Sequence, residues 1–205
     1  FTLNETGDGY IVSDCDTSAN GEMIIPATYN GLPVTGIGDD AFKYCTNLTS
    51  VIIPESVTNI GNTAFFECSN LTSVTIGDSV TTIDSSAFSY CYDLTSVTIP
   101  DSVTTIGYEA FYNCYNLQYV VMGNAMDTVY GDAFNGCSDL KHVLFKGDQA
   151  QKDFILFKSG NDSIKNATWH INATGNEITW EKICWNTYGY CAICQGYFTG
   201  DPSTA

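Results

Sequence analysis

The stretch LTSVTIPDSVTTIGYEAFYNC, residues 94–114, holds one unit of a pattern that runs through the middle of the chain. Its closing motif, Ala-Phe-x-x-Cys, recurs every 23 residues, with the cysteine at positions 45, 68, 91, 114 and 137. A leucine follows three residues after each cysteine, and a valine follows three residues after that leucine. Five units share this register without an insertion. Self-similarity at a period of about 20 to 50 residues is typical of a solenoid or another repeat array.

Each unit predicts two extended segments and one tight turn. The segment Leu-x-x-Val-x-Ile alternates apolar and outward residues and is rich in β-branched side chains, which indicates a strand. Pro54, Pro100, Gly77 or Gly123 ends that strand. Ser56 to Ile60 is a second, shorter extended piece, and Ala-Phe-x-x-Cys is predicted to form a single helical or 3-10 turn. Stacking the units in parallel would bury a column of phenylalanines at positions 42, 65, 88, 111 and 134.

The nine cysteines are too regularly placed to be a disulfide framework. Five of them occupy one position of the repeat, and an odd total cannot pair completely within the chain. Equivalent residues of neighbouring turns would lie within disulfide reach. However, five identical positions cannot all pair, and bridging two of them would distort the stack. We therefore expect the repeat cysteines to be buried, reduced thiols that act as small hydrophobic side chains.

Composition excludes several classes of partner. The chain of 205 residues has 23 acidic and 7 basic side chains, all seven of them lysine, for a formal charge of -16. A nucleic-acid partner is disfavoured because phosphate binding depends on clustered positive charge. Hydrophobic residues make up 44% of the chain and charged residues 15%, which favours an ordered protein. No apolar run approaches the roughly 18 to 20 residues of a membrane span, so no direct membrane insertion is expected.

The repeat resembles the BspA-like leucine-rich repeat family, which has 23-residue, Treponema-type repeats. The resemblance rests on Leu94–Gly107 followed by Ala110-Phe111-x-x-Cys114, and it extends over about residues 20–172. It implies an α/β repeat fold: a right-handed, β-rich leucine-rich-repeat solenoid with parallel sheet stacking. It also implies an extracellular or cell-surface protein that adheres to a host or bacterial surface protein or glycan. The family supplies no catalytic residues and no cofactor.

The chain divides into four parts on this interpretation. Residues 1–31 form an N-terminal cap, with a strand at Tyr10–Val12 and a hairpin loop at 14–21. Residues 32–146 hold the five repeats. Residues 147–172 form a C-terminal cap, with Asp148 as a helix cap and residues 166–171 as a last edge strand. Residues 173–205 are a cysteine-containing extension or the start of a next module.

The cysteines of this extension are weak metal candidates. Cys191 and Cys194 form one CxxC motif, Cys184 precedes it, and His170 is the only nearby fourth ligand. A zinc site, one disulfide and free thiols are all open interpretations. No metal is predicted.

An enzyme is not expected. The chain has two histidines, neither within an HExxH motif, and it lacks the G-x-S-x-G and GxxxxGK[ST] motifs. His142 falls in an outward column of the predicted sheet, where a solvated surface histidine is expected.

Two groups of side chains are candidate ligand contacts. Small Thr and Ser residues fill the outward face of the first three strands, whereas the last two rows are larger and more varied. A set of tyrosines outside the core columns forms the second group, because tyrosine is favoured at recognition surfaces. A filler face and tyrosines packed flat on the next turn are the alternatives. The candidates are Gln118, Tyr119, Val121, Lys141 and His142 on the sheet, and Tyr90, Tyr92, Tyr108, Tyr112 and Tyr115 on the turns.

Two functions fit these features. The first is a non-enzymatic binding or adhesion domain that contacts a protein or glycan on host or neighbouring cells. The second is a structural spacer within a larger surface protein, which the bland Thr and Ser rows favour.

Overall fold

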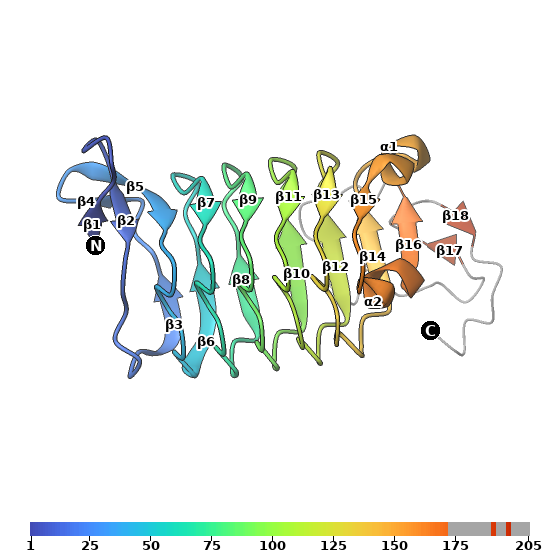
Figure 1. Cartoon of the computed structure of the whole chain (residues 1–205), viewed down its shortest axis with the longest axis horizontal. Coiled ribbons are helices and arrows are strands. Elements are labelled where there is room, and N and C mark those ends of the chain that lie inside the picture. Colours follow the sequence, from blue (N-terminus) through green and yellow to red (C-terminus); the bar gives the residue numbers. More distant parts are fainter. Residues whose placement is uncertain (172–189, 192–195, 198–205) are drawn as a thin grey trace.

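The protein is a solenoid of stacked turns with mainly parallel strands on two sides of a shared core (Figure 1). The longer strands form two sheets, of three and four strands, and the shorter strands form one sheet opposite them. The computed structural model describes residues 1–171, 190–191 and 196–197. Each turn contributes one longer strand to one side and one two-residue strand to the other. The architecture confirms the predicted leucine-rich-repeat solenoid with parallel stacking.

The longer strands carry the Leu-x-x-Val-x-Ile pattern. They pair in parallel in a register that advances by one 23-residue unit, so that Val97 lies beside Val120, and Val120 beside Val143. The strands in order along the stack are β3 (Asn20–Ile24), β6 (Asn47–Ile52), β8 (Ser73–Thr75), β10 (Ser96–Ile99), β12 (Tyr119–Met122), β14 (His142–Phe145) and β16 (Thr168–Ile171).

The opposite side is built from shorter strands, ordered along the stack as β1 to β15. Threonine hydroxyls link some of its turns, as where Thr81 Oγ1 donates to the Thr58 carbonyl at 3.2 Å. The strands are β1 (Thr2–Leu3), β2 (Tyr10–Val12), β5 (Leu32–Ile37), β7 (Asn59–Ile60), β9 (Thr82–Ile83), β11 (Thr105–Ile106), β13 (Thr128–Val129) and β15 (Leu156–Phe157), with β4 (Thr28–Tyr29) antiparallel to β5.

The repeat phenylalanines form the predicted buried column. The centroids of neighbouring rings lie 4.8 to 5.3 Å apart, and the rings are within 12° of parallel. Phe65, Phe88 and Phe111 are fully buried. The ring spacing is close to the spacing of the strands, so each ring stacks on the same ring of the next turn.

The repeat cysteines are buried and reduced, as predicted. Each of four thiols also donates a hydrogen bond to the phenylalanine carbonyl of the preceding turn, as from Cys91 Sγ to Phe65 O at 3.3 Å. The same carbonyl accepts the amide of its own turn's cysteine. Each of these thiols therefore fills space in the core, as predicted, and also donates a hydrogen bond to a buried acceptor, which was not predicted.

The Ala-Phe-x-x-Cys corner is not the predicted helical or 3-10 turn. Two residues of each corner adopt a left-handed backbone, such as Ser86 with φ 54° and Tyr90 with φ 62°. Because the backbone is left-handed at these two residues, alternate amide groups of the corner point toward the next turn. Phe88 N donates to Ala110 O at 2.7 Å, and Tyr90 N donates to Tyr112 O at 2.8 Å. Hydrogen bonding between turns therefore outweighs the strain of the left-handed backbone.

Glycine and proline occupy the position that follows the longer strand, for a steric reason. A Cβ on Gly77 would lie 2.5 Å from the Pro54 carbonyl oxygen, and one on Gly123 would lie 2.4 Å from that of Pro100. The backbones of neighbouring turns approach too closely there for a larger residue at the two glycines.

The N-terminal cap differs from the prediction in one respect. β2 is a strand, as expected, but it pairs in parallel with β5, and β3 pairs in parallel with β6 on the other side. The segment at residues 13–19 therefore crosses between the two sheets and is not a hairpin loop.

The C-terminal cap closes the stack with two short helices. α1 (Gln149–Phe154) begins at Asp148, whose side chain accepts from the Gln151 amide in a capping box, as predicted. α2 (Asp162–Asn166) follows, and β16 is the expected last edge strand on this side. Buried Asn161 accepts from the Phe134 amide at 3.1 Å, in place of the alanine carbonyl that the next turn supplies elsewhere in the stack, and it donates to the Tyr130 carbonyl at 2.7 Å.

Candidate binding surface

The C-terminal end of the outward sheet face is not the open surface that the sequence predicted. Val121 is 2% exposed and His142 is 5% exposed, so neither side chain is available to a ligand. Leu144, in the same outward set, is fully buried. Tyr119 and Gln118 are half-buried, and Lys141 is exposed. The prediction of a solvated His142 is wrong because the outward column of β12 and β14 is covered.

His142 instead forms a buried pair with His170. Its Nδ1 lies 3.2 Å from His170 Nε2, and the two residues face each other from the neighbouring strands β14 and β16. Burial lowers the pKa of both rings, that of His170 to about 4. The nearby charge of Lys141 further lowers the pKa of His142, and His142 further lowers that of His170. The pair is therefore neutral at physiological pH.

Four of the five predicted tyrosines of the turns come together, and Tyr44 and Phe66 join them. Tyr44 contacts Phe66, Phe66 contacts Tyr90, and Tyr90 contacts both Tyr92 and Tyr112, with ring centroids 5.2 to 6.0 Å apart. Tyr92 stacks on Tyr115 at 5.3 Å and 6°. We call this set the aromatic row: Tyr44, Phe66, Tyr90, Tyr92, Tyr112 and Tyr115.

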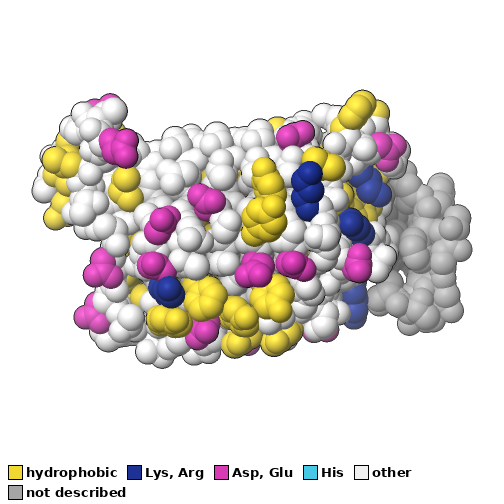
Figure 2. All heavy atoms as spheres, viewed as in Figure 1, with side chains coloured by type: hydrophobic (Ala, Val, Ile, Leu, Met, Phe, Trp, Pro, Cys, Tyr) yellow, Lys and Arg dark blue, Asp and Glu magenta, His cyan; other side chains and the backbone are white. Residues whose placement is uncertain are grey.

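The residues of the aromatic row stand shortly after the column phenylalanine of their turn, in four consecutive turns. Tyr44 and Tyr115 are 48% and 44% exposed, and the others are half-buried. Figure 2 shows hydrophobic side chains gathered along one edge of the solenoid, with acidic side chains beside them. Tyr44 and Phe66 could have been found from the sequence, because they occupy the two positions between phenylalanine and cysteine where Tyr90 and Tyr112 also stand.

Tyr108 belongs to a different surface. It is 56% exposed, and its ring contacts Tyr130 at 5.0 Å. In the structure as described, its ring makes no contact with the aromatic row. The sequence grouped it with the other tyrosines because of its turn, but it precedes the left-handed residue Glu109, on the other side of the corner.

Carboxylates flank the middle of the aromatic row. Partial burial raises the pKa of Tyr90, and Tyr112 and the nearby charges of Glu109 and Glu67 add to the shift. The pKa of Tyr92 is raised by desolvation, by Tyr115 and by Glu67. Both glutamates thus act on the Tyr90 phenol, and Glu67 also acts on that of Tyr92.

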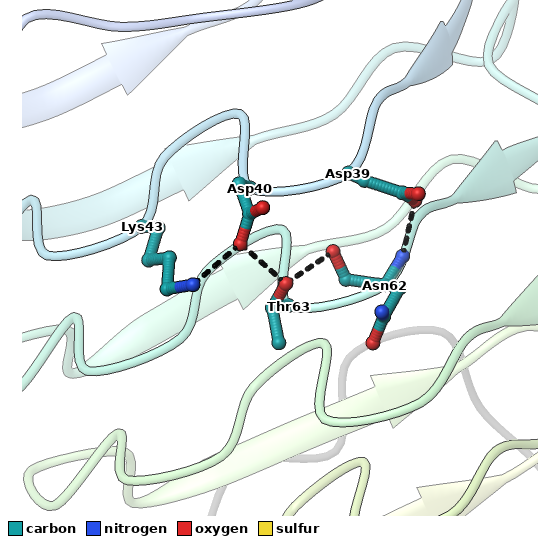
Figure 3. A network of polar contacts seen from close by, with 5 residues as sticks. All are labelled: Asp39, Asp40, Lys43, Asn62 and Thr63. Atoms are coloured by element: carbon teal, nitrogen blue, oxygen red, sulfur yellow. Dashed lines mark hydrogen bonds and ion pairs between the residues drawn. The ribbon is translucent and has the colours of Figure 1, made fainter.

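A lysine occupies the N-terminal end of the aromatic row. Lys43 Nζ lies 5.6 Å from the centroid of Tyr44 and 5.7 Å from that of Phe66, within the range of a cation–π interaction. Asp40 holds the ammonium in an ion pair of 2.8 Å and also accepts from the Thr63 hydroxyl at 2.6 Å, as Figure 3 shows. These bonds lower the pKa of Asp40, chiefly through Lys43 and then through Thr63.

The described residues contain no cluster of three or more His, Cys, Asp or Glu that could hold a metal ion. Cys184 and Cys194 lie outside the described residues, and of Cys191 only the backbone is described, in β17 (Tyr190–Cys191), which pairs with β18 (Gly196–Tyr197). Neither described helix has the length and apolar character needed to cross a membrane.

Comparison with known proteins supports the repeat assignment. A family model described as BspA type Leucine rich repeat region matches residues 33–164 in six copies. No curated protein matches the chain. A leucine rich repeat protein of Treponema pallidum is 30% identical, with a TM-score of 0.67, over 70% of this chain and 66% of that one.

Two further solved structures are similar. A leucine rich cell surface protein of Faecalibacterium prausnitzii is 30% identical, with a TM-score of 0.68, over 77% of this chain and 40% of that one. The pneumococcal vaccine antigen PcpA is 18% identical, with a TM-score of 0.54, over 74% of this chain and 40% of that one, and shares the fold alone. The chain thus spans less than two thirds of each relative's length. The repeat ladder and the match over most of the chain establish that it belongs to the BspA-type leucine-rich repeat family.

Proposed function

We propose that this chain is a non-enzymatic binding domain of a cell-surface or secreted protein, which adheres to a protein or glycan on host or neighbouring cells. The observation that carries the proposal is the aromatic row, which presents six rings over four consecutive turns on one edge of a rigid stack. Tyrosine contributes large contact area and a hydroxyl at low entropic cost.

The family supports the general part of this proposal, which is a binding role. Its leucine-rich repeats are a scaffold that is usually non-enzymatic and that typically has a protein-binding role, and the similar F. prausnitzii protein is named as a cell surface protein. Gln118, Tyr119 and Lys141 remain predicted contacts, because all three are at least partly exposed. Val121 and His142 are no longer proposed as contacts.

A structural spacer is the second candidate function, and the small side chains on the outward face of the middle strands favour it. The outward positions of β8 are Ser73 and Thr75, both exposed and small. Thr98 continues this plain face on β10. A stack that only holds other domains apart needs no more than such a face.

The test is capture from mucus and matrix extracts, together with a glycan array, using the full chain and two variants. Tyr92→Ala with Tyr115→Ala removes a stacked pair from the aromatic row, and Tyr108→Ala with Tyr130→Ala removes the tyrosine pair of the other surface as a matched control. We expect the first variant to lose ligands that the control retains. Equal capture by both variants and the unmodified chain would refute the role of the aromatic row, and absence of any ligand at micromolar concentration would favour the spacer.

A further inference from the structure

The aromatic row is a negatively charged surface without a cation over most of its length. Residues 1–140 contain seventeen acidic side chains and one lysine, Lys43. Residues 44–140 contain ten acidic side chains and no lysine, arginine or histidine. The described residues form two ion pairs, Lys43 with Asp40 and Lys146 with Asp101, and neither includes Glu67 or Glu109. Asp40 is the main cause of the raised pKa of Lys43, and the charge of Glu67 contributes to it.

Lys43 shows how this surface accommodates a cation. Its ammonium lies over two rings of the aromatic row, and a carboxylate 2.8 Å away fixes it there. The same components recur further along the row. Glu67 N donates to the carbonyl of Ser89, the residue before Tyr90, at 2.9 Å. The Ser89 hydroxyl donates to the Glu109 carbonyl. Both glutamates therefore stand beside Tyr90, and Glu67 also acts on the Tyr92 phenol. The segment 44–140, which carries this second position, supplies rings and carboxylates but contains no lysine, arginine or histidine of its own.

We propose that Tyr90, Tyr92, Tyr112 and Tyr115, with Glu67 and Glu109, bind lysine or arginine side chains of a basic polypeptide segment. The inference rests on the proposed function and names its partner class. Ring faces attract ammonium and guanidinium groups, and flanking carboxylates strengthen that attraction and fix its position. The formal charge of -16 repels acidic glycans and proteins and speeds the encounter with basic ones.

The experiment measures binding of fluorescent ten-residue oligolysine and oligoarginine peptides to the full chain, at low and physiological salt. A neutral Gly-Ser-Gln peptide and a neutral oligosaccharide are the comparison probes. Glu67→Gln with Glu109→Gln removes the flanking charges. Glu55→Gln with Asp78→Asn removes two exposed charges from the turns after β6 and β8, and is the control with the same net charge.

We expect the flanking variant to weaken oligolysine binding about five-fold, whereas the control changes it less than two-fold. Tyr90→Leu should weaken binding about three-fold, and Tyr90→Phe should retain it, because the ring face and not the hydroxyl holds the cation. Circular dichroism confirms that each variant is folded. Binding should weaken as salt rises.

Three results would overturn the inference. Equal losses in the flanking and control variants would mean diffuse attraction to the whole acidic chain. Binding of the neutral peptide as tight as that of oligolysine would remove the role of charge. Neutral oligosaccharide binding that depends on Tyr90 but not on Glu67 and Glu109 would make the row a glycan site, which would leave the proposed adhesion function intact.

Discussion

Replacing Phe88 by alanine tests whether the phenylalanine column holds the stack together. Phe88 is fully buried between Phe65 and Phe111, with ring centroids 5.1 and 5.3 Å away and rings within 7° of parallel. Alanine leaves a cavity in the middle of the column that neither neighbouring turn can close, because the strands on both sides fix the distance between turns. A buried phenylalanine replaced by alanine costs about 4 kcal/mol of unfolding free energy.

The measurement is urea denaturation followed by far-ultraviolet circular dichroism, with thermal melting alongside it. A loss of about 4 kcal/mol corresponds to a fall in Tm of about 10 °C for a chain of this size. Phe88→Leu, which fills most of the volume but cannot stack, should cost about 1.5 kcal/mol.

The chain offers a matched control for the same chemical change. Phe154, in α1, is 84% exposed, so Phe154→Ala should change the unfolding free energy by no more than about 0.5 kcal/mol. Should Phe88→Ala and Phe154→Ala prove equally costly, the column would contribute nothing beyond an ordinary surface residue, and the argument from stacking would be refuted.

Three further predictions concern thiols, histidines and a glycine. Burial raises the pKa of Cys45 and Cys68 to about 12, so iodoacetamide at pH 8 should label none of the repeat cysteines until the chain is denatured, and a mass-detected bridge between two of them would contradict this. Burial lowers the pKa of His170 to about 4, below its value in the unfolded chain, so the unfolded chain takes up the proton first as the pH falls. The free energy of unfolding should therefore be unaffected by His170 above about pH 6.5 and should fall by on the order of 3 kcal/mol between there and pH 4. Thermal melting of His170→Phe over the same pH range should lack that decline. Gly123→Ala should cost at least about 2 kcal/mol in urea denaturation, because its Cβ would lie 2.4 Å from the Pro100 carbonyl oxygen, and a neutral result would show that neighbouring turns can separate.

Most of the core could be predicted from the sequence because identical residues at identical positions must meet in a stacked repeat. Phe88 and Cys91 were predicted to be buried, and both are fully buried. The hydrogen bond from the Cys91 thiol was not predictable, because its acceptor, the Phe65 carbonyl, is supplied by the preceding turn.

Errors arose where the repeat meets its ends. His142 occupies an outward column, and in the middle of the stack the equivalent positions Ser73 and Ser96 are exposed or half-buried. At the last turns this column is covered, and β16 brings His170 against His142. A periodic pattern describes neighbours that are alike, and it contains no information about what covers the final turns.

The sequence by itself determined the repeat period, the inward columns and the charge, because each depends on residue identity and spacing alone. Only the tertiary structure decided which surface residues act together. Tyr44 and Phe66 join Tyr90 because stacking brings positions about 23 residues apart within ring contact, while Tyr108 points elsewhere although it lies only four residues from Tyr112. The left-handed corner residues separate those neighbours, and their conformation is set by hydrogen bonds to the next turn, which no single unit of the sequence contains.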